Sequence, residues 1–183
     1  MVKEFWDFDE NINYSTVNIQ GKNYKVINKF PDYYSAALIL NYIHNIIIKI
    51  CMYLKINYYK YSNNDQILID CFCDIHPNNY ILSEMQLGTM FNGLNKPRNL
   101  HKTNKPPIGK DGQLRAGFRN VFLTLRGKDG KFNSENKIMK LVIHEIAHTM
   151  CNHVTWRDDD HGSDFKHAEK LITDAYMKIK DNK

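Results

Sequence analysis

His144-Glu145-Ile146-Ala147-His148 is the segment whose residue types and spacing best suit chemistry. Residues four apart on an α-helix lie on the same face, about 6 Å apart along its axis. Two imidazoles in that arrangement can bind one Zn²⁺ ion. Glu145 directly follows the first histidine, so its carboxylate would lie beside the metal and could take a proton from an attacking water. The pattern therefore predicts a zinc site with Glu145 as general base.

The surrounding sequence predicts the helix that would carry this motif. Apolar residues recur throughout 138–147, so such a helix would be buried on one side. Asn133 or Ser134 can cap its start, and Glu135 suits its first turn. A buried helix does not normally carry two histidines and a glutamate unless something pairs with them, which favours a metal. The alternative is an exposed helix with a polar stripe that binds none.

A catalytic zinc site needs a third protein ligand and one open position. His161 lies thirteen positions after His148, beyond a loop, and Gly162 after it lets the backbone come close. We favour His161, and we expect His167 to be a surface residue. The alternatives for the third ligand are His153, Glu169 and Asp164.

The remaining hydrophobic patterns predict an α+β fold. All 183 residues fit one domain, 1–183, with a hydrophobic core. The expected elements are a β-hairpin over 17–27, a long helix over 33–56, strands over 66–74 and 120–126, the helix of the histidine motif, and a last helix that Ser163 or Asp164 caps. The stretch 80–90 is compatible with either a strand or a short helix.

Three other stretches need separate interpretation. Residues 1–16 are polar and aromatic without a clear period, which is typical of a mobile arm or an edge segment. Residues 92–118 form a long basic loop, and loops of that length are usually functional or disordered. Residues 36–54 are apolar, but Asn41 and Lys49 belong to one polar stripe along them. This indicates a core helix, and we expect no membrane association.

Composition and cysteine usage indicate the class of protein and its cellular compartment. The chain is 43% hydrophobic and 25% charged, which is typical of a globular domain. Its four cysteines form no C-x-x-C pair, and residues 1–10 lack the apolar stretch of a secretory signal. We therefore expect an intracellular protein, in the cytoplasm or nucleus. The abundance of Asn, Ile, Lys and Tyr is typical of AT-rich coding sequences and would suit a large DNA virus.

Three motifs, in order along the chain, resemble the WLM-domain and SprT-like (Spartan-type) zinc metallopeptidases. Residues 91–95 (FNGLN) resemble the G-L-N element of the WLM family, and 122–126 (FLTLR) resemble the strand that follows it. Residues 138–148 (IMKLVIHEIAH) resemble the zinc helix. Residues 161–165 (HGSDF) are similar to the H-G-x-x-F run of SprT-like proteases.

This resemblance implies a compact zincin-like domain, in which a small mixed sheet packs on the active-site helix and a C-terminal helix follows. The family's roles carry over to His144, His148 and His161 as Zn²⁺ ligands and to Glu145 as general base. By position, the strand over 120–126 would be the edge strand that lines the cleft and pairs with substrate. Arg126 and Tyr80 are candidate donors to the developing oxyanion. These families cleave proteins trapped covalently on DNA, so the resemblance also implies a protein substrate and DNA as a partner.

The charge distribution is compatible with a nucleic-acid partner. Residues 96–131 contain ten basic and two acidic residues, a net charge of +8, whereas the whole chain carries +5. A basic patch beside the predicted cleft favours phosphate backbones. The residues expected to face DNA are Lys96, Arg98, Lys102, Lys105, Arg115 and Arg119. The alternatives are a general zinc peptidase without a nucleic-acid role and a non-catalytic, zinc-stabilised binding module.

Overall fold

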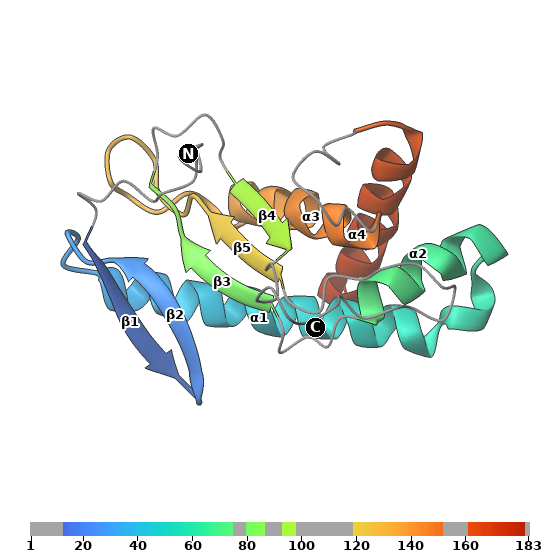
Figure 1. Cartoon of the computed structure of the whole chain (residues 1–183), viewed down its shortest axis with the longest axis horizontal. Coiled ribbons are helices and arrows are strands. Elements are labelled where there is room, and N and C mark those ends of the chain that lie inside the picture. Colours follow the sequence, from blue (N-terminus) through green and yellow to red (C-terminus); the bar gives the residue numbers. More distant parts are fainter. Residues whose placement is uncertain (1–12, 75–79, 87–92, 98–118, 152–160, 182–183) are drawn as a thin grey trace, which may run out of the picture.

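The computed structural model of the chain describes residues 13–74, 80–86, 93–97, 119–151 and 161–181. These residues form a five-stranded mixed sheet and four α-helices (Figure 1), which confirms the predicted α+β class. The elements are β1 (Tyr14–Ile19), β2 (Lys22–Ile27), α1 (Tyr33–Ile56), the 3-10 turn η1 (Tyr58–Lys60), α2 (Asn63–Cys73), β3 (Tyr80–Glu84), β4 (Gly93–Pro97), β5 (Arg119–Leu123), α3 (Glu135–Met150) and α4 (Ser163–Asp181).

The sheet has the strand order β1-β2-β3-β5-β4, with β1 and β4 at its edges. The β1/β2 hairpin is antiparallel and turns at Gln20 and Gly21, which both have positive φ. The predicted hairpin is therefore present, and β1 begins within the stretch interpreted as a mobile arm or edge segment. Strands β2, β3 and β5 are mutually parallel, whereas β4 runs antiparallel to β5. The ambiguous stretch 80–90 contributes strand β3.

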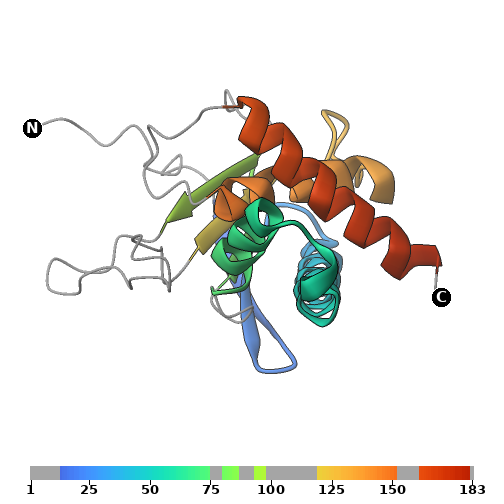
Figure 2. The same ribbon diagram turned by 90° about the vertical axis from the view of Figure 1, so that its right-hand side faces the viewer.

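Alternate side chains of the sheet point toward the helices. Val26, Leu82, Val121 and Leu123 are at most 1% exposed and belong to the same core as the buried faces of α1 and α3. Helices α1 and α3 contact the sheet directly, and α4 packs on both of these helices (Figures 1 and 2). The hydrophobic core therefore lies between one face of the sheet and the helices.

Helix α1 occupies the predicted range and is a core helix. It is long and apolar enough to cross a membrane by length and composition, but half of its most apolar window is buried inside the structure. Ala36, Leu40, Ile47 and Leu54 are each 0% exposed. Packing within the domain therefore accounts for the apolar residues on the buried side of this helix.

The prediction of a strand over 66–74 was wrong, because residues 66–73 belong to helix α2 and Asp74 caps its end. Ser62 caps this helix: its hydroxyl accepts the Asp65 amide at 3.2 Å, and the Asp65 carboxylate accepts the Ser62 amide. Ile69, Phe72 and Cys73 follow the helical spacing and are buried in the core. The reciprocal cap and the helical period together favour a helix over a strand.

Candidate active site

Helix α3 presents the first two histidines. It begins at Glu135 and is capped by Ser134, one of the two predicted cap residues, whose hydroxyl accepts a hydrogen bond from the Lys137 amide. Its apolar side is buried in the core. His144 and His148 are half-buried, and their ring centroids lie 5.3 Å apart. One helix therefore fixes two imidazoles side by side, as their i, i+4 spacing requires.

The segment just before helix α4 adds the third histidine. His161 is exposed and lies two residues before the first residue of α4, and its Nε2 is 3.3 Å from Nε2 of His144. One ring nitrogen of each of the three histidines lies within 4.8 Å of the other two. Zn–N bonds of 2.0–2.1 Å at tetrahedral angles would place ligand nitrogens about 3.3 Å apart. The three imidazoles are therefore close enough to hold a metal ion, and the donor set suits zinc.

Phe165 supports all three imidazoles from the protein side. This residue of α4 is 3% exposed, and its ring centroid lies 5.0, 4.7 and 4.5 Å from those of His144, His148 and His161. The ring offers no competing ligand atom and shields that side of the histidines from water. Since α3 carries two of the histidines and α4 carries Phe165, the geometry of the site depends on how these two helices pack.

Glu169 lies on the outer side of His144. Its Oε1 is 3.4 Å from Nδ1 of His144, whereas Nε2 of the same ring faces His161. A carboxylate beside one ring nitrogen favours a proton there and leaves the lone pair of the other nitrogen for a metal. The structure thus places Glu169 where it can orient a ligand histidine, and it is not a member of the three-residue group.

Glu145 is 4% exposed, and its side chain lies between the axis of its own helix, α3, and strand β4. The Asn95 side-chain amide, on β4, donates to the backbone carbonyl of Glu145 and, at 2.9 Å, to the hydroxyl of Thr149. Gly93, on the same strand, lies directly against the Glu145 carboxylate. The candidate general base is therefore held on the sheet side of α3, next to a strand.

The strand beside Glu145 is not the one that the sequence predicts as the edge. β5 pairs with β3 on one side and with β4 on the other, so it is an interior strand. β4 is the edge on this side of the sheet, and it lies within the stretch 92–118 that the sequence predicts as a loop. Its pairing with β5 supplies the regular backbone that the polar, proline-containing sequence does not indicate.

The other third-ligand candidates lie elsewhere or outside the described residues. Asp164 is exposed in the first turn of α4 and does not join the histidine group. His153 and the loop that contains it lie outside the described residues. His167 is half-exposed, as expected, and its Nε2 lies 2.5 Å from Oδ1 of Asp65. The hydrogen bond from His167 holds the pKa of Asp65 below its usual range.

Arg119 does not face DNA as predicted, because it is 1% exposed on an interior strand. It pairs in register with Tyr80, a buried residue whose phenol pKa is raised by burial. Tyr80 and Arg126 are only 3% and 5% exposed, so neither side chain is accessible to a substrate as an oxyanion donor. The side chain of Lys96 and all of Arg98, Lys102, Lys105 and Arg115 lie outside the described residues.

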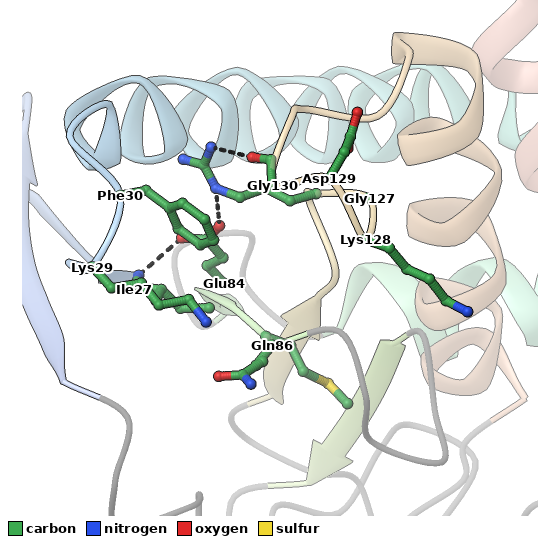
Figure 3. A pocket seen from close by; sticks show the side chains of 11 residues that line it. Ile27, Lys29, Phe30, Glu84, Gln86, Gly127, Lys128, Asp129 and Gly130 are labelled. Atoms are coloured by element: carbon green, nitrogen blue, oxygen red, sulfur yellow. Dashed lines mark hydrogen bonds and ion pairs between the residues drawn. The ribbon is translucent and has the colours of Figure 1, made fainter.

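Arg126 instead forms a buried ion pair with Glu84, at the centre of an ionic cluster beside a separate pocket whose lining residues Figure 3 shows. Its Nε donates to Glu84 at 2.9 Å, and its terminal nitrogens contact Asp32 and the Gly130 carbonyl. Its guanidinium lies 4.3 Å from the ring centroid of Phe30. Glu84 also accepts the Ile27 amide. This cluster joins β2, α1, β3 and the turn before α3, which is a structural role.

No protein-family model, curated protein or solved structure matches this chain. The fold and the site define the chain as an α+β domain in which two histidines of α3 and a third just before α4 lie close enough to hold a metal ion.

Proposed function

We propose that the protein is a zinc-dependent endopeptidase similar to the WLM and SprT-like enzymes. The observation that carries this proposal is the convergence of His144, His148 and His161, with ring nitrogens within 4.8 Å of one another. Among the described residues, no fourth ligand joins this group. A three-histidine set with an open position is the arrangement of catalytic zinc, whereas structural zinc is bound by four protein ligands.

The placement of Glu145 next to an edge strand supports peptide hydrolysis. A substrate backbone that paired with β4 would extend the sheet by one strand and run alongside helix α3. Zinc, when bound, supplies Lewis acidity that polarises a carbonyl and makes an attacking water more acidic. In this arrangement the Glu145 carboxylate takes the proton of the attacking water and passes it to the leaving amine.

DNA-bound or DNA-crosslinked proteins are the substrate class that the resemblance and the charge support. The segment 96–131 keeps a net charge of +6 after its two buried arginines, Arg119 and Arg126, are removed from its +8. Phosphate backbones attract a segment of that charge. The rival function is a general zinc peptidase, which the burial of these two arginines favours because the basic surface is smaller than predicted.

The test is cleavage of a DNA-binding protein with and without single-stranded DNA, by the wild-type protein and by Glu145→Gln, with the zinc content of both measured. We expect cleavage by the wild type alone, a higher rate with DNA, and equal zinc in both proteins. Cleavage that requires Glu145 but ignores DNA at low and high salt would establish the general peptidase. Tight zinc binding without any cleavage would contradict the enzyme and support a binding module.

A further inference from the structure

The backbone conformation of Gly93 does not require glycine, but the space around its Cα does. It lies in strand β4 opposite Leu123, and its φ is outside the positive range that favours glycine. A methyl group at this position would lie 2.9 Å from the carboxyl carbon of Glu145 and 2.7 Å from Cδ1 of Leu141, and closer still to Glu145 Oε1. Gly93 is the first residue of β4, and its lack of a side chain leaves room for the close approach of the Glu145 carboxylate.

Asn95 ties the same strand to the same turn of helix α3. Gly93 and Asn95 are two residues apart, so both side-chain positions face the helix. The Asn95 amide donates to the Glu145 carbonyl and to Thr149 Oγ1, which lies one helical turn further along. Asn95 therefore fixes the position of β4 along α3, and with it the position of Gly93 over the Glu145 carboxylate.

We propose that Gly93 and Asn95 are positioning residues that set the orientation of the Glu145 carboxylate relative to the edge strand. Gly93 leaves the space that the carboxylate occupies, and Asn95 keeps β4 in register with the helix. The consequence for catalysis rests on the proposed peptidase function. A proton-transfer group misplaced by about 1 Å can lose roughly two orders of magnitude in rate, so this contact would matter for turnover more than for substrate binding.

A stability cycle tests the contact independently of activity. Gly93→Ala should lower the Tm by about 3–10 °C, because overpacking forces neighbouring atoms to shift. The same substitution should lower the Tm clearly less in a Glu145→Ala background, where the carboxylate is absent and only the contact with Leu141 Cδ1 remains. In a Leu141→Ala background it should still lower the Tm. An equal loss with and without Glu145, or a loss that only Leu141→Ala removes, would overturn the proposal.

Kinetics test the consequence for catalysis. Gly93→Ala should lower kcat about 10- to 100-fold while KM changes less than about threefold and one zinc stays bound. Gly127→Ala is the matched control: its added methyl would meet the side chain of Asp129 at 3.0 Å, away from the histidines, and its kcat should equal that of the wild type. A Gly93→Ala protein with wild-type kcat would contradict the positioning role.

Asn95→Ala is the second variant, and it decides the question if Gly93→Ala does not fold. It adds no atoms, and we expect it to lower kcat with zinc content and KM retained. Wild-type kcat in this variant would overturn the role of Asn95. If the wild-type protein and Glu145→Gln do not differ in cleavage, the proposed function fails. The stability cycle still decides whether Gly93 leaves the space that the Glu145 carboxylate occupies.

Discussion

His144 has a neighbour at each of its two ring nitrogens. Nε2 faces His161 at 3.3 Å, and Nδ1 faces the Glu169 carboxylate at 3.4 Å. Carboxylates in this outer position fix the tautomer and the orientation of a ligand histidine and raise its basicity. Helix α4 thus contributes Phe165, which packs on the rings, and Glu169, whose carboxylate lies beside Nδ1 of His144.

Glu169→Gln should lower zinc affinity about 10- to 100-fold, because an amide is a weaker partner for the Nδ1 proton than a carboxylate. Competition with a chelator of known affinity measures this change. Asp174→Asn serves as the control, since Asp174 pairs with Lys170 on exposed α4 surface and should leave zinc affinity unchanged. Equal affinity in wild type and Glu169→Gln would show that Glu169 does not act on His144.

At the scale of elements, the Arg126 cluster holds the chain segments that precede helix α3, which carries His144 and His148. Arg126 and Glu84 have side chains that are 5% and 1% exposed, and their nitrogen and oxygen lie 2.9 Å apart. The Arg126 guanidinium also lies 3.9 Å from the ring centroid of Phe132, which stabilises the cation further. Removing one partner of such a pair leaves a buried charge uncompensated.

Arg126→Leu should therefore destabilise the protein by about 3–5 kcal/mol, measured by denaturant unfolding. Adding Glu84→Gln to the same chain should recover part of that loss, because glutamine carries no charge and still accepts the Ile27 amide. A double variant as unstable as the single one would show that the orphaned charge is not the main cost.

The pKa of Asp32 predicts how the stability of this cluster changes at low pH. The hydrogen bond from Arg126 holds the pKa of Asp32 below its usual range. Its contribution to stability is therefore present above its unfolded pKa and is lost as the pH falls through the lower folded pKa. The Tm advantage of wild type over Asp32→Asn should shrink between about pH 5 and pH 2. Burial raises the pKa of nearby Glu84, so the contribution of Glu84 to stability changes with pH in the opposite direction. The comparison with Asp32→Asn is needed to separate the two contributions.

The elements that the sequence predicts well are those whose local signals agree with their packing. Helix α3 has a Ser134 cap, an apolar face and the histidine motif, and it forms where predicted. Helix α2 was mistaken for a strand because Ile67, Ile69, Cys71 and Cys73 alternate while apolar residues also occupy intervening positions. The spacing Ser62-x-x-Asp65 is the signal that would have identified the helix start.

Long-range contacts decide the features that the sequence does not predict. Helix spacing and ligand type constrain His144 and His148. The place of His161 after a loop and before Gly162 favours it as the third ligand, with His153, Glu169 and Asp164 as alternatives. The close approach of Gly93 to Glu145 spans 52 positions in the chain, and no local pattern encodes it. The burial of Arg119 likewise follows from the position of β5 between β3 and β4. The sequence alone suggests that this basic residue lies on the surface.

At the scale of the whole molecule, the histidine site joins helix α3 to the segment that begins α4. A metal ion bound by residues from both would stabilise the folded state, because the unfolded chain does not hold the three imidazoles together. Removing the metal with a chelator should lower the Tm by about 10 °C, given a ligand concentration near 1,000 times its Kd. Thermal unfolding before and after readdition of zinc measures this, and an unchanged Tm would argue against a shared metal.

The zinc content of His161→Ala tests the central claim most directly. His167→Ala is the matched control, because His167 also lies on the α4 side but contacts Asp65 and is not a member of the histidine group. We predict one zinc per chain in the wild type and in His167→Ala, and loss of zinc from His161→Ala during dialysis against a mild chelator. Zinc retained as tightly in His161→Ala as in the wild type would contradict the three-histidine site.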